Sequence, residues 1–290
     1  MKILDYIELP DYINKNNIIS YKNLDNVQIN DSQIIYLNLS EDFLENGDIE
    51  QWLSNQTNKC IIINNVDIDF PPPKKPWRYD KYYHLYPEIG LNVQYKDKIQ
   101  MQLLEILEKN NLFIISCSVS VNHPRVLNFP IGIYHNFEPR YFHYKTKNKR
   151  YLCYANFGIP CDRWYGNPRK NILPMIKNKT FIYTENNKSQ DEFYQTISQS
   201  KFTICPRGCG IDTYRLWDTI CLGSIPIIEK TDGHFNLLDL PIYFIDSIYE
   251  IEKITEEQLE KKYEEMMNID FNYYKLTIQY WENIMKNIFI

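Results

Sequence analysis

The sequence predicts an α/β protein in which parallel strands are covered by helices on both faces. From residue 150 onward, short apolar runs alternate with amphipathic stretches of helical length, as in βαβ units. These runs are largely apolar rather than alternating, which is typical of strands buried on both sides. The 290 residues, 44% of them hydrophobic, suffice for one large domain or two medium ones. We place a boundary near 140–150, in the charged segment YFHYKTKNKR.

The first half alternates less regularly. Its apolar runs predict strands at 33–39, 60–66 and 112–118, and a strand or an extended run at 126–133. A helix over 41–55 would open at Ser40 as N-cap, and the apolar spacing of 96–109 predicts an amphipathic helix. A stiff proline-rich loop at 71–76 and a tyrosine-rich stretch around Tyr79 to Tyr86 separate these elements.

The second half is regular enough to assign each element in turn. Pro174 interrupts one helical segment, whereas Thr255 and Gln258 have the spacing of a capping box. The expected strands cover 151–157, 180–184, 201–205, 224–229 and 241–245. The expected helices cover 169–178, 189–200, 212–223, 255–268 and a closing segment over 273–289.

Composition excludes several classes of protein. The 32 Lys and Arg against 37 Asp and Glu give a net charge of −5, which argues against a general nucleic-acid binder. No apolar run is long enough to span a membrane, and the N-terminus lacks the apolar core of a secretory signal. The seven cysteines form no CxxC pair, so we read them mainly as buried thiols of a cytoplasmic protein.

Glycine and arginine are both scarce and are placed unevenly. Four of the nine glycines are Gly208, Gly210, Gly223 and Gly233. Arginine binds phosphate in a bidentate way that lysine cannot reproduce, so each arginine retained in this lysine-rich chain is either a candidate for anion binding or part of a surface ion pair. The eight arginines are Arg78, Arg125, Arg140, Arg150, Arg163, Arg169, Arg207 and Arg215.

The segment 200–230 carries the most chemical information. A buried strand ends at Cys205, a glycine loop follows, and Asp212 or Thr213 caps the next helix. Such a unit directs backbone N–H groups and the positive end of a helix at the carboxyl edge of a parallel sheet, where anions bind. Arg207 and Arg215 would clamp a diphosphate there. The alternative is a plain βαβ turn with two solvent-facing arginines.

Asp218 lies three residues after Arg215 on the same helical face. It would either accept hydrogen bonds from ribose hydroxyls or hold Arg215 in place. Arg163 and Arg169 follow the first strand of this half and are candidates for a second clamp, although for Arg169 a solvated loop is the slightly favoured interpretation. Glu229 and Lys230 would either touch the ligand or form a solvated turn.

The string P-R-G-x-G-x-D-T-Y-R-x-W-D, followed by G-S-I-P-I-I, resembles the C-terminal signature of exostosin-like glycosyltransferases, family 47 and relatives. The segments 123–133 and 154–157 fit the upstream pattern of that family. The resemblance implies a GT-B architecture of two Rossmann-like domains, with C-terminal helices packing back across them. It assigns 1–145 to an acceptor-side domain and 146–290 to a domain that binds a nucleotide sugar.

The resemblance also implies an activity, namely inverting, metal-independent transfer of a sugar from a nucleotide donor, most plausibly a UDP-sugar. The acceptor would be a hydroxyl of a glycan or glycoconjugate, and no cofactor beyond the donor is implied. The base candidates are His123, Asp80, Glu88 and His84, and Arg215 would stabilise the leaving group. The implied donor-binding residues are Asn156, Arg163, Arg207, Gly208, Gly210, Asp212, Thr213, Tyr214, Arg215 and Asp218.

Three alternatives stay open. Asp218 stands where many relatives carry Glu, which, with the unmatched first hundred residues, keeps a non-catalytic nucleotide-sugar or glycan-binding module in view. A GDP-sugar enzyme of the fucosyltransferase type has a similar layout, but usually with Lys in the helix. The DxD pattern of Asp67 and Asp69 would instead suggest a metal-dependent enzyme.

Overall fold

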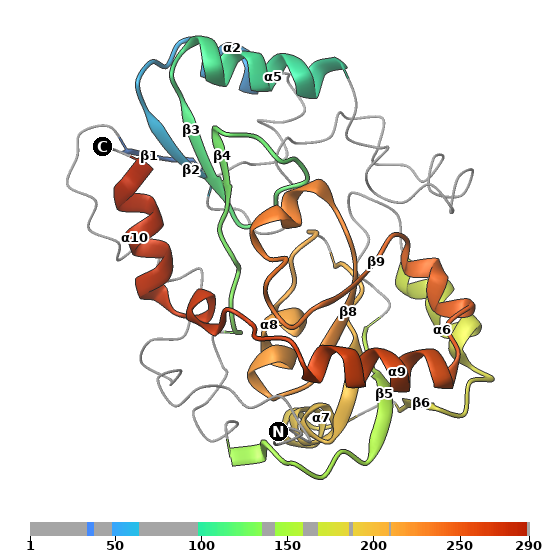
Figure 1. The fold of residues 1–290 in the computed structure, drawn as a ribbon. Helices are drawn as coiled ribbons and strands as arrows, with labels where there is room; N and C mark the ends of the chain where they lie inside the picture. Colours follow the sequence, from blue (N-terminus) through green and yellow to red (C-terminus); the bar gives the residue numbers. More distant parts are fainter. Residues whose placement is uncertain are drawn as a thin grey trace.

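The structure, a computed structural model, describes residues 34–37, 48–63, 98–134, 143–158, 168–185, 188–208 and 210–288. These residues build two parallel sheets (Figure 1), one with strand order β1-β2-β3-β4 and one with order β6-β5-β7-β8-β9. Every strand pairing in both sheets is parallel. The predicted α/β class is therefore confirmed.

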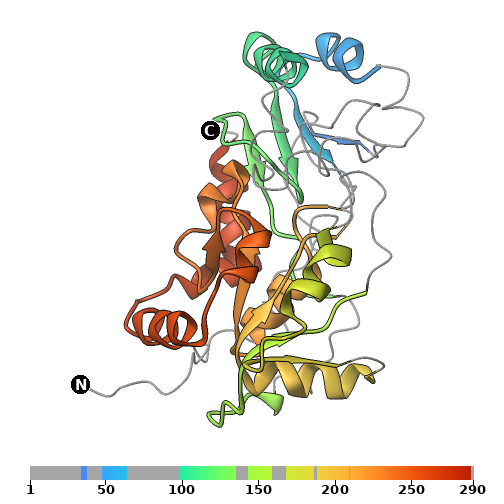
Figure 2. The same ribbon diagram turned by 90° about the vertical axis from the view of Figure 1, so that its right-hand side faces the viewer.

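The first sheet is buried on both faces. Along its strands, alternate residues point to opposite sides, so Ile61 and Ile114 pack under two helices while Cys60, Ile62 and Ile115 face the other way. Figure 2 shows the two helices together at one end of the molecule. The elements of this unit are β1 (Ile34–Leu37), α2 (Asp48–Ser54), β2 (Cys60–Ile63), α5 (Lys98–Lys109), β3 (Phe113–Ser116) and β4 (Val126–Asn128).

The second sheet has the strand order of a doubly wound fold. Its first strand in sequence, β5, lies between its second and third, β6 and β7, so the chain reverses direction across the sheet between β5 and β7. In such sheets, ligands bind at the carboxyl edge beside this reversal. The strands are β5 (Tyr151–Ala155), β6 (Ile182–Thr184), β7 (Ser200–Ile204), β8 (Ile225–Glu229) and β9 (Tyr243–Ile245).

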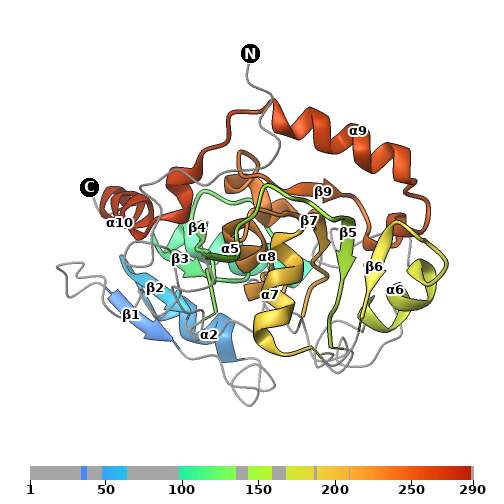
Figure 3. The ribbon, with the colours of Figure 1, turned by 90° about the horizontal axis from the view of Figure 1, so that it is seen from below.

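Helices cover both faces of the second sheet. Ile172 of α6 (Pro168–Ile176) and Leu259 of α9 (Glu256–Met267) pack with Phe202 on one face. On the other face, Ile197 of α7 (Gln190–Ser198) and Ile220 of α8 (Tyr214–Cys221) pack in the cluster that includes Tyr154. Figure 3 shows α7 and α9 on opposite sides of the strands. Short 3-10 turns, η4 (Asp232–Asn236) and η5 (Ile248–Glu252), follow β8 and β9.

The end of the chain returns to the first sheet. After η6 (Tyr273–Leu276), α10 (Ile278–Ile288) leads back toward the first sheet (Figure 1). Trp281 and Met285 of α10 are buried in the same cluster as Ile62 and Phe129. The Trp281 ring meets the Phe129 ring edge to face, with centroids 5.6 Å apart. This confirms the expected packing of a C-terminal helix across both units, although only α10 makes the crossing.

Two expected elements differ in detail from the structure. The helix expected over 273–289 is divided, because Thr277 is extended at φ −101 and ψ 146. The run expected over 126–133 is a strand only to Asn128. The helix expected to open at Ser40 is described from Asp48 onward, and Ser40 lies outside the described residues.

The two carboxyl edges meet at a joint. Residues that follow β3 and β4 contact residues that follow β7 and β8: Ser118 Oγ accepts from the Ile211 amide at 2.9 Å, and Asn128 Nδ2 donates to the Gly233 carbonyl at 2.9 Å. A methyl group at Gly233 would lie 1.7 Å from the Val119 carbonyl oxygen. Glycine is therefore required where the two backbones touch.

Candidate functional site

The candidate site lies at the carboxyl edge of the second sheet, beside the reversal between β5 and β7. The segment Asn156 to Gly158 follows β5, and the glycine loop from Pro206 to Gly208 follows β7. Because neighbouring parallel strands end at the same edge, these two segments flank one position. The topology thus brings together two of the segments that the sequence singled out.

Arg215 is held at this edge by aromatic rings. Its guanidinium carbon lies 5.1 Å from the Phe193 ring centroid and 5.9 Å from that of Phe157. Its Nε and Nη1 atoms are buried and have no hydrogen-bond partner among the described residues. Burial, together with the nearby charge of Arg169, lowers the pKa of Arg215 to about 10, so the group stays protonated at neutral pH. A buried cation with unused donors is suited to bind an anion.

Asp212 faces the joint between the two units. Its Oδ2 accepts from the Ile131 amide at 2.8 Å, and its Oδ1 accepts from Trp217 Nε1 at 2.8 Å. The N-cap of α8 is Thr213, which makes no side-chain capping bond. Burial raises the pKa of Asp212 to about 7 despite these hydrogen bonds. Both carboxylate oxygens are thus engaged within the protein, and a direct contact of Asp212 with a donor stays a prediction.

Asp218 is also turned toward the first unit. Its Oδ1 accepts from the Tyr134 amide at 3.3 Å and its Oδ2 from the Tyr194 hydroxyl at 3.2 Å. It is only 4% exposed, and this burial raises its pKa to about 7. The ring of Tyr214 meets that of Tyr134 edge to face at 5.1 Å beside it. The geometry favours a role in holding Tyr134 over the expected ribose contact.

Arg207 is buried and lies near η5. Burial raises the pKa of Tyr249, the hydrogen bond with Asn171 lowers it, and the charges of Glu229 and Arg207 act on it in opposite directions. Glu229 is itself buried and accepts from the Ile248 amide at 3.2 Å. The expectation that Glu229 forms a solvated turn is therefore wrong. The joint clamp of Arg207 with Arg215 stays a prediction.

Arg169, near the start of α6, bridges the two segments. Its Nε donates to the Arg207 carbonyl at 2.9 Å, its Nη2 to the Pro206 carbonyl at 3.4 Å and its Nη1 to the Gly158 carbonyl at 3.1 Å. The expectation of a solvated loop at Arg169 is wrong, since its guanidinium is fixed on backbone carbonyls from two loops.

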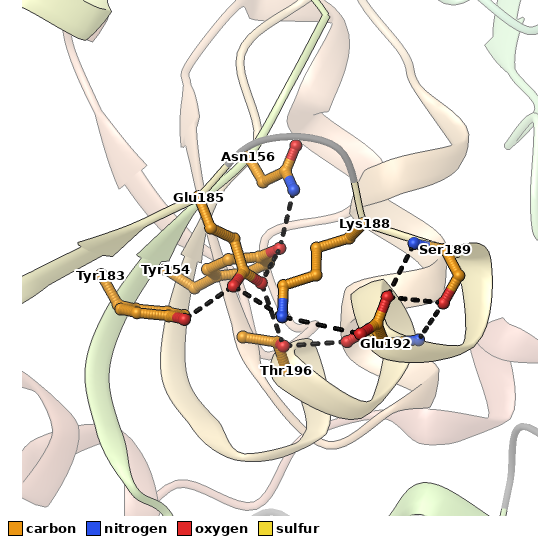
Figure 4. A network of polar contacts seen from close by, with 8 residues as sticks. All are labelled: Tyr154, Asn156, Tyr183, Glu185, Lys188, Ser189, Glu192 and Thr196. Carbon is orange, nitrogen blue, oxygen red and sulfur yellow. Dashed lines mark hydrogen bonds and ion pairs between the residues drawn. The ribbon is translucent and has the colours of Figure 1, made fainter.

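A polar network beside the site, drawn in Figure 4, is centred on Glu185. Its carboxylate accepts from the hydroxyls of Tyr154 at 3.2 Å and Tyr183 at 2.6 Å, and pairs with Lys188 at 2.9 Å. Burial alone would raise the pKa of Glu185, but these hydrogen bonds leave it below its ordinary value. Asn156 Nδ2 donates to the Tyr154 hydroxyl at 3.0 Å, so the network fixes the orientation of Asn156.

The sequence did not single out Glu185, Phe157 or Phe193 as site residues. The only available signal for Glu185 was its position directly after a strand. That position is common to many acidic residues and therefore weak.

His123 lies at the opposite edge of the first sheet. It precedes β4, its Nδ1 accepts from the Arg125 amide at 3.2 Å, and its Nε2 lies 3.3 Å from Glu108 Oε1. A general base must reach the acceptor hydroxyl, and the joint with the second unit is at the carboxyl edge. This position does not favour His123. The other base candidates and one donor candidate lie outside the described residues: Asp80, His84, Glu88 and Arg163.

Gly208 and Gly210 form a closed turn in which the Gly208 amide donates to the Gly210 carbonyl at 3.1 Å. The five cysteines within the described ranges are free and buried, in agreement with the predicted buried thiols.

No helix in the described part of the chain is long and apolar enough to cross a membrane. Asp67 and Asp69 lie outside this part, so the absence of a metal requirement stays a prediction.

The fold and site thus define an α/β protein of two parallel sheets with a partly buried arginine, Arg215, at the carboxyl edge of the second. A family model described as the RXYLT1 C-terminal domain matches residues 167–273, from the start of α6 to the start of η6. The matched segment contains the glycine loop, Arg169 and Arg215.

Three curated relatives are named ribitol-5-phosphate xylosyltransferase 1. The human protein is 29% identical over 132 residues, which cover 41% of this chain and 29% of the relative. The mouse protein is 26% identical over 153 residues (46% and 34%), and the Danio rerio protein is 21% identical over 139 residues (41% and 30%). The chain therefore spans about a third of the length of these relatives. Over the matched region it is related to a glycosyltransferase family.

Among solved structures, sucrose-phosphate synthase from Thermosynechococcus elongatus aligns with a TM-score of 0.40 and 12% identity, over 88% of this chain and 73% of that one.

Proposed function

We propose that the protein is a glycosyltransferase that moves a sugar from a nucleotide donor, most plausibly a UDP-sugar, to a hydroxyl of a glycan or glycoconjugate. The observation that carries the proposal is Arg215, whose Nε and Nη1 atoms are buried at the carboxyl edge of the sheet and have no hydrogen-bond partner among the described residues. The relation of 167–273 to the C-terminal domain of a xylosyltransferase supports the same activity.

The electrostatics of the site support a diphosphate as the group that is bound. The charge of Arg169 lowers the pKa of Arg215, so two guanidinium groups lie within electrostatic range of each other. The two acids of the motif, Asp212 and Asp218, accept hydrogen bonds from other groups of the protein, and burial raises the pKa of each to about 7, although the charge of Asp218 still acts on Arg215. The local charge is therefore positive, which suits a ligand with two or more negative charges.

In the proposed reaction, the acceptor hydroxyl loses its proton to a base as its oxygen attacks the anomeric carbon. The bond from that carbon to the diphosphate breaks at the opposite side, which inverts the configuration. Negative charge grows on the leaving phosphate, and the Arg215 guanidinium and the amino end of α8 would stabilise it. The base would come from the first unit, and no metal would be needed.

The decisive measurement is calorimetric binding of UDP, GDP and their common sugar conjugates, with and without EDTA. We expect EDTA-insensitive binding of UDP and a loss on the order of 100-fold or more in Arg215→Ala. The matched control is Arg150→Ala, an exposed arginine at the amino end of β5 that should keep wild-type affinity. Wild-type affinity in Arg215→Ala would refute the assigned site.

The same binding measurement, together with an assay of sugar hydrolysis and transfer, separates the competing functions. Preference for GDP over UDP would favour a fucosyltransferase-like enzyme. UDP-sugar binding without hydrolysis or transfer would favour a non-catalytic module, and loss of binding or activity in EDTA would favour a metal-dependent enzyme.

A further inference from the structure

We propose that Arg169 is a positioning residue of this site, which holds the loops after β5 and β7 at a fixed separation rather than contacting the ligand itself. The inference rests on the proposed function only for the identity of the ligand, a nucleoside diphosphate. Three donor groups of Arg169 are hydrogen-bonded to the backbone carbonyls of Gly158, Pro206 and Arg207.

These three carbonyls belong to the two segments that flank the reversal of the chain. Gly158 follows β5, whereas Pro206 and Arg207 follow β7. A guanidinium presents five donors in a rigid plane and can join acceptors on two segments at once, whereas a lysine ammonium is a compact point donor. The bridge therefore depends on the shape of arginine as well as on its charge.

Gly208 supplies the space for this bridge. A Cβ atom at Gly208 would lie 3.1 Å from Arg169 Nη2 and 3.7 Å from a methyl carbon of Thr213. The described glycines with a positive φ are Gly132 and Gly223, so Gly208 is needed here for space and not for a left-handed backbone. The glycine of the loop and the arginine of α6 thus form one unit.

Arg169 also acts on Arg215 electrostatically, without a hydrogen bond between the two side chains, both of which the structure describes. Its positive charge is one of the causes that lower the pKa of Arg215. If charge were its whole contribution, a lysine in its place would suffice. If position is its contribution, lysine will fail, because it cannot reach carbonyls on both loops.

The first experiment compares Arg169→Lys and Arg169→Ala with the matched control Arg150→Lys. We expect both Arg169 variants to bind UDP about 10- to 100-fold more weakly, since hydrogen bonds from a charged group are lost. Amide hydrogen exchange, measured without ligand, should accelerate about tenfold or more in 156–158 and at Arg207 and Gly208. The control should change neither quantity. Full UDP affinity in Arg169→Lys, or unchanged exchange in Arg169→Ala, would overturn the positioning role.

The second experiment is a double-mutant cycle with Gly208→Ala. In the wild-type background the added methyl crowds Arg169, and we expect UDP affinity to fall by about fivefold to tenfold. In the Arg169→Ala background the same methyl has room, so Gly208→Ala should cause no further loss. Strictly additive losses would contradict the proposal.

Failure of the proposed nucleotide binding and failure of the positioning role of Arg169 can be told apart. If the wild-type protein binds no nucleoside diphosphate, the proposed function fails, while hydrogen exchange still decides whether Arg169 holds the two loops. If UDP binds and exchange in both loops is insensitive to Arg169→Ala, only the positioning role fails.

Discussion

The two sheets end at the same joint but use their carboxyl edges differently. The first sheet meets the joint with small uncharged groups, such as the Ser118 hydroxyl and the Asn128 amide, each bonded to the backbone of the other unit. The second sheet brings Arg169, Arg207 and Arg215 to its edge. One edge is therefore suited to rigid attachment and the other to an anion. The comparison indicates that, at the joint, the first unit contributes hydrogen bonds, whereas the second unit contributes the charged groups.

The largest expected effect tests whether the packing of α10 against the first unit stabilises the fold. Trp281 is 1% exposed, stacks edge to face on Phe129 and donates from Nε1 to the Lys275 carbonyl at 2.7 Å. Trp281→Ala should lower the free energy of unfolding by about 4 kcal/mol, measured by urea denaturation. Asn287→Ala, at an exposed position of α10, is the control and should be near neutral. A loss below about 1 kcal/mol would mean that α10 contributes little to the joint.

The next effect tests the closest backbone contact between the units. Gly233→Ala would place a methyl group 1.7 Å from the Val119 carbonyl oxygen, so one backbone must move. We expect a loss of about 3 kcal/mol in unfolding free energy. The exposed Leu238→Ala should change stability much less. A stable Gly233→Ala protein with unchanged UDP affinity would show that the joint is looser than these contacts indicate.

A smaller effect tests the carboxylate that joins the loop to the first unit. Asp212→Asn can accept only one of the hydrogen bonds from Ile131 and Trp217 and presents an N–H group to the other donor. We expect a loss of about 2 kcal/mol in unfolding free energy. Asp246→Asn, at an exposed position, provides the comparison. Equal stabilities of the two variants would mean that the hydrogen bonds of Asp212 do not stabilise the joint.

The smallest effect concerns pH. Because burial raises the pKa of Asp218 to about 7, the folded protein keeps a proton between pH 4 and 7 that the unfolded chain releases, so stability falls as the pH rises through this window. Asp218→Asn does not titrate. Its stability relative to wild type should therefore improve between pH 4 and 7.5, by about 1 kcal/mol or more.

The opposite influence of His234, whose pKa burial lowers to about 4, is common to wild type and Asp218→Asn, and it cancels in this difference. A difference that does not change with pH would mean that Asp218 is ionised throughout the window.

The order of strands and helices was largely predictable from local pattern. Alternating apolar runs located β5 to β9 and their helices, because each pattern spans only a few neighbouring residues. The partners of the acids were not predictable: Asp212 receives the amide of Ile131, which lies 81 residues away in sequence. Helical spacing placed Asp218 beside Arg215, but only the fold shows that Tyr134 and Tyr194 occupy its oxygens.

Arg169 shows the same limit more sharply. The surrounding sequence shows only that an arginine lies near the start of a helix. Its partners are backbone carbonyls, and because every residue has one, the sequence does not show which of them Arg169 binds. A motif therefore located the loop, and the supporting residue could be found only once β5 and β7 were placed side by side.

The crossing of α10 has a consequence for how the molecule is made. One face of the first sheet, which includes Ile62 and Phe129, is covered by Trp281 and Met285 from the other end of the chain. During synthesis this face stays uncovered until the second unit has been translated. Pairings between such distant segments slow folding and leave apolar surface open to aggregation in the meantime. A growing chain would therefore expose this apolar face until α10 has been made.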